Sequence, residues 1–290
     1  MVESNPYRQP ARCPAVWFKR GNGLESAPEW GIQPSERNSP GCAILNRPIA
    51  LGLLLVSPLA LAGQAQIAVA ANFMAPMLQM APAFEAATGH TLLLSSGSTG
   101  KFYAQIKHGA PFDVLLAADD ETPIKLEQEG AAVAGSRFSY AIGKLVLWSA
   151  SADVVDARGE ILRSGRFSHL AIANPRLAPY GRAAQQSLQA LGVWDGLQGK
   201  LVMGENIAQT QQFVASGNAQ LGLVAMSQVW REGRLSSGSA WPVPEKLHAP
   251  IRQDAVLLLK GKDNPAAQSL MNYLRSDAAK TVLRSYGYSY

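Results

Sequence analysis

The chain has 290 residues, of which 47% are hydrophobic and 16% charged, and its formal net charge is +5. Residues 1–65 hold six of its 26 Lys and Arg and four of its 21 Asp and Glu, so the remainder carries about +3, with dispersed basic residues. A nucleic-acid-binding domain gathers Lys and Arg on one face, and this composition disfavours that class. Both cysteines, Cys13 and Cys42, precede residue 66, which excludes a disulfide framework or a cysteine metal site from the rest.

Residues 1–46 read as a leader without structure. They are rich in Pro, Asn, Arg and Ser and show neither helical nor strand periodicity. An export signal follows them, although such a signal normally begins a protein. We therefore expect the true start to lie nearer Arg47 than Met1.

An export signal is predicted at residues 47–65. Residues 49–62 form an apolar run that follows a basic residue and leads into small residues, as in a secretory signal peptide. The run is shorter than the roughly 20 apolar residues of a membrane-spanning helix. A buried core helix is the alternative interpretation. We expect cleavage after Ala62 or Ala65 and a periplasmic mature chain that does not insert into a membrane.

From residue 66 the chain alternates short apolar strands with helical stretches. The first set is expected as a strand over 66–71, a helix over 73–88, a strand over 91–95, a helix over 101–108, a strand over 112–117, and a helix from Asp119 to 128. This βαβ alternation predicts α/β layers with ligands received where strand ends meet helix starts. Asp119 is interpreted as a helix cap rather than a catalytic acid.

A second set of elements follows the apolar strand at 144–149. It is expected as a strand over 169–173, a helix over 181–191, a strand over 200–204, a helix over 207–216, and a strand over 220–225. Two sets in about 225 residues fit two lobes better than one core, because single cores stop growing near roughly 250 residues.

The C-terminal tail, a strand over 253–260 and a helix over 265–286, needs a sheet to join. We expect it to return to the first lobe, which gives two crossings and a hinge. Lobe 1 then spans 66–142 plus 253–290, and lobe 2 spans 143–252. Each lobe is predicted to be a mostly parallel sheet flanked by helices, with a ligand cleft between the lobes.

Residues 95–102 (SSGSTGKF) place hydroxyl residues and glycines directly before a helix, a turn suited to hold an anion. The spacing excludes a nucleotide-binding P-loop, which needs four residues between its glycines and a Ser or Thr after the Lys. A serine-hydrolase elbow is excluded because Gly-x-Ser-x-Gly is absent around Ser98. The alternative is an ordinary helix cap by Ser98 or Thr99.

Short motifs follow one another in a defined order over residues 66–290. They are VAANF at 69–73, ST at 98–99, AQI at 104–106, GAPFDV at 109–114, AIANP at 171–175, PYG at 179–181, ENI at 205–207, LGLV at 221–224 and YGY at 286–288. In this order and spacing the chain resembles the periplasmic molybdate-binding proteins of ABC transporters, within the type II periplasmic binding-protein fold.

The resemblance implies a binding protein, not an enzyme, that holds a tetrahedral oxyanion between its lobes by neutral donors. The implied contacts are Asn72, Thr99 with Ser98 beside it, Tyr180, the backbone N–H of Ile207, and the N–H of Ala71. They touch the oxygens of molybdate or tungstate and are not direct metal ligands. The resemblance also implies a monomer without a cofactor, whose partner is the molybdate ABC permease.

The chain departs from the family pattern at two positions. Some members place a hydroxyl residue where this chain has Ala71, and some relatives have a tyrosine where it has Ala225. This chain is similar to the branch in which the tyrosine near Pro179 reaches the ligand instead. The departures affect the number of donors more than the class of ligand.

The residue types also bear on selectivity. None of the implied contacts is Asp or Glu, so a partly protonated phosphate would leave its hydroxyl unpaired, whereas a fully deprotonated oxyanion would not. Sulfate differs from molybdate mainly in size, and the same module binding sulfate or another tetrahedral oxyanion remains an alternative. An exported ester hydrolase that uses Ser98 or Thr99 as nucleophile is a further alternative, although no motif supplies its base.

Other polar residues have weaker claims to the site. Lys101 follows the anion turn and could contact the ligand or point to solvent. The four histidines are scattered without metal-ligand spacing and are interpreted as ordinary surface or core residues: His90, His108, His169 and His248.

Overall fold

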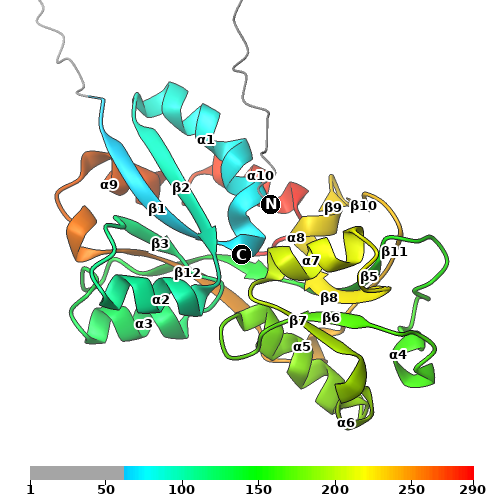
Figure 1. Cartoon of the computed structure of the whole chain (residues 1–290). Coiled ribbons are helices and arrows are strands. Elements are labelled where there is room, and N and C mark those ends of the chain that lie inside the picture. Colours follow the sequence, from blue (N-terminus) through cyan, green and yellow to red (C-terminus); the bar gives the residue numbers. More distant parts are fainter. Residues whose placement is uncertain (1–61) are drawn as a thin grey trace, which may run out of the picture. The chain divides into compact units, whose positions relative to one another are not determined.

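The computed structural model describes residues 62–290, so the predicted leader and the apolar run of the predicted signal, apart from Ala62, lie outside the described residues. The described part contains two five-stranded sheets, each with helices on both faces (Figure 1). Within residues 62–290, no helix is long and apolar enough to span a membrane. The predicted α/β fold with two sheets is confirmed.

The first sheet has the strand order β2-β1-β3-β12-β4. Its strands are β1 (Gln64–Ala70), β2 (Thr91–Gly97), β3 (Val114–Leu116), β4 (Phe138–Gly143) and β12 (Ile251–Leu257). β1 runs parallel to β2 and β3, whereas β12 runs antiparallel to β3 and β4. The carboxyl ends of β1 and β2 therefore lie at the same edge of the sheet.

Alternate residues of β1 face opposite sides of this sheet, and helices cover both. Ile67 and Val69 pack against α1 (Met74–Thr88), α9 (Pro265–Tyr273) and α10 (Asp277–Ser285). Ala68 faces α2 (Thr99–Lys107) and α3 (Glu121–Gln128). The buried residues of α1 include Met77, Met80 and Phe84, spaced three and four positions apart as on one helical face. Burial on both sides explains why β1 is almost wholly apolar.

The second sheet has the strand order β11-β5-β8-β6-β7. Its strands are β5 (Leu145–Ser149), β6 (Leu170–Ala173), β7 (Leu201–Gly204), β8 (Leu221–Ala225) and β11 (Ser239–Pro242). β6 runs parallel to β7 and β8, and β5 runs antiparallel to β8 and β11. Each sheet thus combines three adjacent parallel strands with one strand that opposes its neighbours.

Helices cover both faces of the second sheet as well. On one side lie α4 (Ile161–Ser164), α5 (Pro179–Ala190) and α6 (Trp194–Leu197), and the other side includes α7 (Ile207–Ala215) and α8 (Met226–Val229). The short elements are η1 (Ala71–Phe73), η2 (Gln198–Lys200), η3 (Glu245–Leu247), η4 (Leu259–Gly261), β9 (Trp230–Arg231) and β10 (Arg234–Leu235).

The chain passes between the sheets within a few residues. Lys144 alone separates the end of β4 from the start of β5, and the return runs from β11 to β12. The strands of the first sheet come from residues 64–143 and 251–257, and those of the second from 145–242. The lobe boundaries at 142 and 253 stay a prediction.

The tail differs from the single helix expected over 265–286. Two helices, α9 and α10, occupy this stretch. The hydroxyl of Ser276 accepts a hydrogen bond from the N–H of Ala279 at 3.2 Å and starts the second helix, a cap that interrupts an otherwise continuous apolar period.

Candidate functional site

Strand ends and helix starts meet around one small cavity. η1 follows β1, α2 follows β2, and α7 follows β7, while five residues separate the end of β6 from the start of α5. All six residues predicted for the site line this cavity: Ala71, Asn72, Ser98, Thr99, Tyr180 and Ile207. The positive ends of three helices of nine to twelve residues therefore converge where the first N–H groups lack intrahelical partners.

The cavity is narrow. Its volume of about 10 Å³ is close to the least that admits one water molecule. A tetrahedral oxyanion is larger than water, so binding requires the lining residues to move apart.

Ser98 carries the clearest signal in the cavity. Its side chain is buried, and its Oγ atom has no hydrogen-bond partner, one of three buried side-chain polar atoms in this state among the described residues. The backbone of Ser98 occupies the N-cap position of α2, yet its side chain makes no capping hydrogen bond. A buried hydroxyl without a partner costs about 1–3 kcal/mol. The ordinary-cap interpretation is therefore wrong for this side chain.

Thr99 is held in place beside it. Its Oγ1 accepts a hydrogen bond from the N–H of Ala118 at 3.0 Å, and its side chain is buried. Because a hydroxyl both accepts and donates, its hydrogen remains for an acceptor in the cavity. The next residue, Gly100, donates its N–H to the carbonyl of Leu177 at 3.0 Å, which joins α2 to the turn before α5.

Asn72 lies in the cavity wall, but its side-chain amide is engaged within the protein. Nδ2 donates to Oε1 of Gln253 at 2.8 Å and to the hydroxyl of Tyr288 at 2.9 Å. Both amide hydrogens are thus used. The predicted donation from this side chain to a ligand requires one of these bonds to be exchanged, and it stays a prediction.

Tyr180 is the second residue of α5, after Pro179, and its ring is buried. Its hydroxyl oxygen accepts a hydrogen bond from Nε2 of Gln253 at 3.0 Å. Burial raises the pKa of Tyr180 well above its ordinary value, so the phenol stays protonated and can donate.

The remaining two predicted contacts are backbone N–H groups, and their role as ligand donors stays a prediction. Ile207 is the first residue of α7, and the preceding Asn206 accepts the N–H of Gln209 at 3.0 Å through its side chain. This cap satisfies a later N–H group of the first turn and leaves that of Ile207 without an intrahelical partner. Ala71 begins η1, and its methyl group leaves only the N–H as a donor.

Charged side chains lie near the cavity without lining it. Lys101 pairs with Glu205, from the loop before α7, and both side chains are largely exposed. Lys101 does not line the cavity, and this disfavours the interpretation that it contacts the ligand. Exposed pairs of this kind add little stability because water and salt screen them.

A second group of ion pairs joins α5 to the first sheet's helices. Arg182 contacts Asp119 at 3.1 Å and Glu121 at 2.6 Å. Burial raises the pKa of Asp119, although its hydrogen bonds to Thr122 and the Arg182 guanidinium act in the opposite direction. Asp119 Oδ1 also accepts the N–H of Thr122 at 3.1 Å, which supports its predicted role at the start of α3.

Gln253 is the residue that the sequence reasoning missed. It is fully buried on β12 and contacts both Asn72 and Tyr180. The available signal was the polar pair of Gln253 and Asp254 inside an otherwise apolar strand, since buried polar groups are normally paired. Such a pattern indicates buried partners but does not name them.

Other features of the described residues do not compete with this cavity. A larger open groove of about 910 Å³ lies beside the end of β5 and the loops before β6 and β8, where Phe167, Val214 and Gln220 contribute to its wall. It contains none of the motif residues singled out above. Within residues 62–290, no group of three or more His, Cys, Asp or Glu could hold a metal ion.

Comparisons with known proteins agree with this geometry. The family profile for bacterial extracellular solute-binding proteins matches residues 65–289. The molybdate-binding protein ModA of Azotobacter vinelandii is 58% identical over 240 residues, which cover 83% of this chain and 95% of the relative. The molybdate-binding protein ModA of Rhodobacter capsulatus is 48% identical over 243 residues, covering 82% of this chain and 94% of the relative.

The solved structure of the Azotobacter vinelandii periplasmic molybdate-binding protein superposes with a TM-score of 0.76 at 39% identity, over 78% of this chain and 99% of that one. The match extends over nearly the whole described part of the chain and includes both sheets. The resemblance predicted from the order of the motifs is therefore confirmed, and the chain belongs to the family of bacterial extracellular solute-binding proteins.

Proposed function

We propose that this protein is an exported binding protein that captures molybdate, and tungstate with it, and delivers the anion to an ABC permease. The observation that carries the proposal is the buried, unpartnered hydroxyl of Ser98 at a point where three helix N-termini converge. The names of the relatives above support molybdate as the ligand.

The cavity is suited to a fully deprotonated anion. Its lining contains no Asp, Glu, Lys, Arg or His. Hydroxyl and N–H donors solvate the negative charge in place of water, and each hydrogen bond to a charged partner contributes about 1.5–3 kcal/mol. A protonated phosphate would bring a hydroxyl for which the wall offers no carboxylate acceptor. We infer that the site favours molybdate, tungstate or sulfate over phosphate.

Binding, rather than catalysis, fits this chemistry. A hydrolase that used Ser98 or Thr99 as nucleophile would need a general base within hydrogen-bond reach, and the lining has neither imidazole nor carboxylate. The relatives carry the names of binding proteins. The protein therefore releases its ligand chemically unchanged.

Delivery depends on a change of shape. The proposed ligand contacts come from η1 and α2 beside the first sheet and from α5 and α7 beside the second. An anion that touches both sets binds the closed arrangement better and shifts the population toward it. A permease that recognises the closed form thereby distinguishes loaded protein from empty protein.

We infer export to the periplasm, with cleavage after Ala62. β1 begins at Gln64 and pairs with Thr91 of β2 from that residue onward. Cleavage after Ala65 would remove the first two residues of this strand, including the fully buried Ala65. N-terminal sequencing of the secreted protein tests this choice.

The test of the function is calorimetric titration of the purified protein with molybdate, tungstate, sulfate and phosphate at one pH and salt concentration. Saturable binding of molybdate and tungstate, without heat from phosphate, is the expected result. Binding of sulfate alone would support the proposed oxyanion site but would contradict molybdate as its ligand. The absence of binding heat with all four anions would overturn the proposed function.

A further inference from the structure

The polar residues of the cavity are connected from behind by one buried amide. We propose that Gln253 is a positioning residue that orients the Tyr180 hydroxyl as a hydrogen-bond donor toward the bound oxyanion. The inference rests on the proposed function and deepens it, because it assigns selectivity for deprotonated anions to a residue outside the cavity lining.

The geometry of Gln253 gives its two amide atoms separate roles. Oε1 accepts from Nδ2 of Asn72 at 2.8 Å and lies 3.1 Å from the hydroxyl of Tyr140. Nε2 donates to the hydroxyl oxygen of Tyr180 at 3.0 Å. The side chain is fully buried, so water does not offer it other partners. One residue thus links an element beside the first sheet, through Asn72, to α5 beside the second.

The hydrogens of this cluster have assigned acceptors within the protein. Asn72 uses both amide hydrogens on Gln253 and Tyr288. Tyr288 donates to the carbonyl of Asn72 at 3.0 Å, and Tyr140 donates to the carbonyl of Ala117 at 2.9 Å. None of these bonds uses the hydroxyl hydrogen of Tyr180, for which the neighbouring Tyr288 hydroxyl is the hydrogen-bond acceptor in the ligand-free protein.

The direction of the hydrogen bond from Nε2 of Gln253 to the Tyr180 hydroxyl decides what Tyr180 can do. Because its oxygen already accepts from Gln253, Tyr180 meets its other partner as a donor, and that partner can change from the Tyr288 hydroxyl to an oxygen of an anion in the cavity that Tyr180 lines. A phenol without such a partner could equally accept a hydrogen bond from a hydroxyl of the anion. Gln253 therefore favours ligands whose oxygens carry no proton. The contacts of its Oε1 atom with Asn72 and Tyr140 fix the orientation of its amide group.

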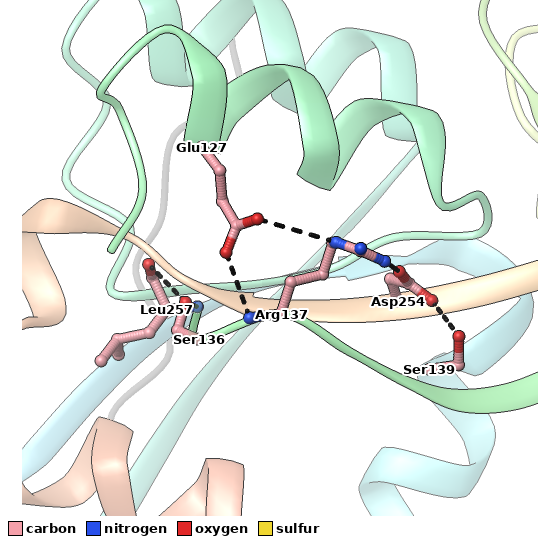
Figure 2. Close-up of polar contacts among 6 residues, drawn as sticks. All are labelled: Glu127, Ser136, Arg137, Ser139, Asp254 and Leu257. Atoms are coloured by element: carbon pink, nitrogen blue, oxygen red, sulfur yellow. Dashed lines mark hydrogen bonds and ion pairs between the residues drawn. The ribbon is translucent and has the colours of Figure 1, made fainter. Parts of the chain in front are cut away.

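The residue after Gln253 on β12, Asp254, makes a separate set of contacts. The pairing of β12 with β4 shifts register between Gln253 and Asp254, so that Gln253 opposes Ala141 and Asp254 opposes Ser139. Such a bulge redirects neighbouring side chains. Figure 2 shows the result for Asp254, which contacts Nη1 of Arg137 at 2.5 Å and the hydroxyl of Ser139 at 2.6 Å. Two adjacent polar residues reach separate sets of partners, because successive side chains of a strand point to opposite faces.

The test is a double-mutant cycle with molybdate, measured by calorimetry. Gln253→Met removes the donor at similar volume, and Tyr180→Phe removes the hydroxyl. Each single variant is expected to weaken binding about tenfold. The double variant is expected to bind within about twofold of Tyr180→Phe, because Gln253 acts through the missing hydroxyl. Melting of each ligand-free variant shows whether it is folded.

Two results would overturn the inference while the proposed function stands. One is unchanged affinity in folded Gln253→Met. The other is an equal loss in the Tyr180→Phe background, which would place the effect at Asn72. Failure of the unaltered protein to bind molybdate would instead overturn the proposed function.

If Gln253→Met does not fold, Gln253→Glu takes its place. It retains an oxygen for Asn72 and Tyr140 and changes only the group that faces Tyr180 from donor to acceptor. Burial raises the pKa of the introduced carboxyl, and its protonated form can still donate to Tyr180. Titration at a pH that ionises the carboxyl should give a loss of more than tenfold, because the carboxylate attracts the Tyr180 hydrogen and repels the anion. Binding as tight as in the unaltered protein would contradict the proposal.

Discussion

A single hydroxyl group, on Ser98, is buried without a partner at the positive end of α2. In the empty protein this group lowers stability, and a bound oxyanion would supply the missing acceptor. Ligand affinity and ligand-free stability should therefore respond in opposite directions when the hydroxyl is removed.

We expect Ser98→Ala to weaken molybdate binding by about 1.5–3 kcal/mol, because a donor to a charged ligand is lost. The melting temperature of the ligand-free protein should stay equal or rise, since no protein hydrogen bond is broken. Ser95→Ala, the same change at an exposed position of β2, is the matched control and should alter neither quantity. A lower melting temperature with unchanged affinity would show that the hydroxyl is structural.

Thr99→Val should reduce both affinity and stability. The substitution removes a donor to the ligand and leaves the buried N–H of Ala118 without its acceptor, which costs about 1–3 kcal/mol of unfolding free energy. Thr99→Ser keeps the hydroxyl and serves as the control. Calorimetry and urea unfolding of both variants make the measurement. Equal stability of the Val and Ser variants would contradict the assigned hydrogen bond.

At the scale of elements, the end of β4 shapes the site by leaving room. A Cβ atom at Gly143 would lie within 2.5 Å of Nε2 of Gln253 and even closer to the hydroxyl oxygen of Tyr180. These atoms form the hydrogen bond that orients the tyrosine. The strand that precedes the crossing to the second sheet therefore ends in a residue without a side chain for steric reasons.

Gly143→Ala is expected to displace the Tyr180 hydroxyl, to weaken molybdate binding at least tenfold and to lower the melting temperature. Gly196→Ala in α6 is the control, because its Cβ would meet no atom within 4 Å and should leave binding unchanged. Calorimetry of both variants decides the matter. Wild-type affinity in Gly143→Ala would show that the tyrosine position is not critical.

How far the sequence predicts these elements depends on whether their signal is local. β1, α1 and α7 follow from apolar periodicity, and their observed bounds lie within two residues of expectation. β4 (FSYAIG) was missed because Ser139 and Tyr140 break its apolar run. The partner of Asn72 could not be predicted, because Gln253 lies 181 positions away and only the tertiary fold brings them together. The motifs predicted six residues that line one cavity, but they did not show that the Asn72 amide donates to other protein side chains rather than toward the cavity.

For the whole molecule, three buried tyrosines beside the site couple folding to alkaline pH. Burial raises the pKa of Tyr140 and Tyr180 well above the ordinary value, and it raises the pKa of Tyr288 to about 12. In the unfolded chain these phenols ionise near pH 10. Between about pH 10 and 12 the folded state therefore holds more protons than the unfolded state, and stability must fall as the pH rises.

We expect the unfolding free energy to change little from pH 7 to 9 through these groups. It should then fall above pH 10 by up to about 1.4 kcal/mol per pH unit for each tyrosine. Urea unfolding at pH 8, 10 and 11 measures the slope, and Tyr288→Phe should make it shallower. A slope unchanged in Tyr288→Phe would contradict the raised pKa of this residue.

The neutral wall of the cavity has a consequence for the energetics of uptake. No carboxylate, imidazole or amine lines the site, and its phenol stays protonated at neutral pH. Loading a dianion should then neither release nor consume protons, so the heat of binding should be the same in buffers of different ionisation enthalpy. The protein would carry both negative charges of its cargo unchanged to the membrane, and the permease alone would deal with their transfer.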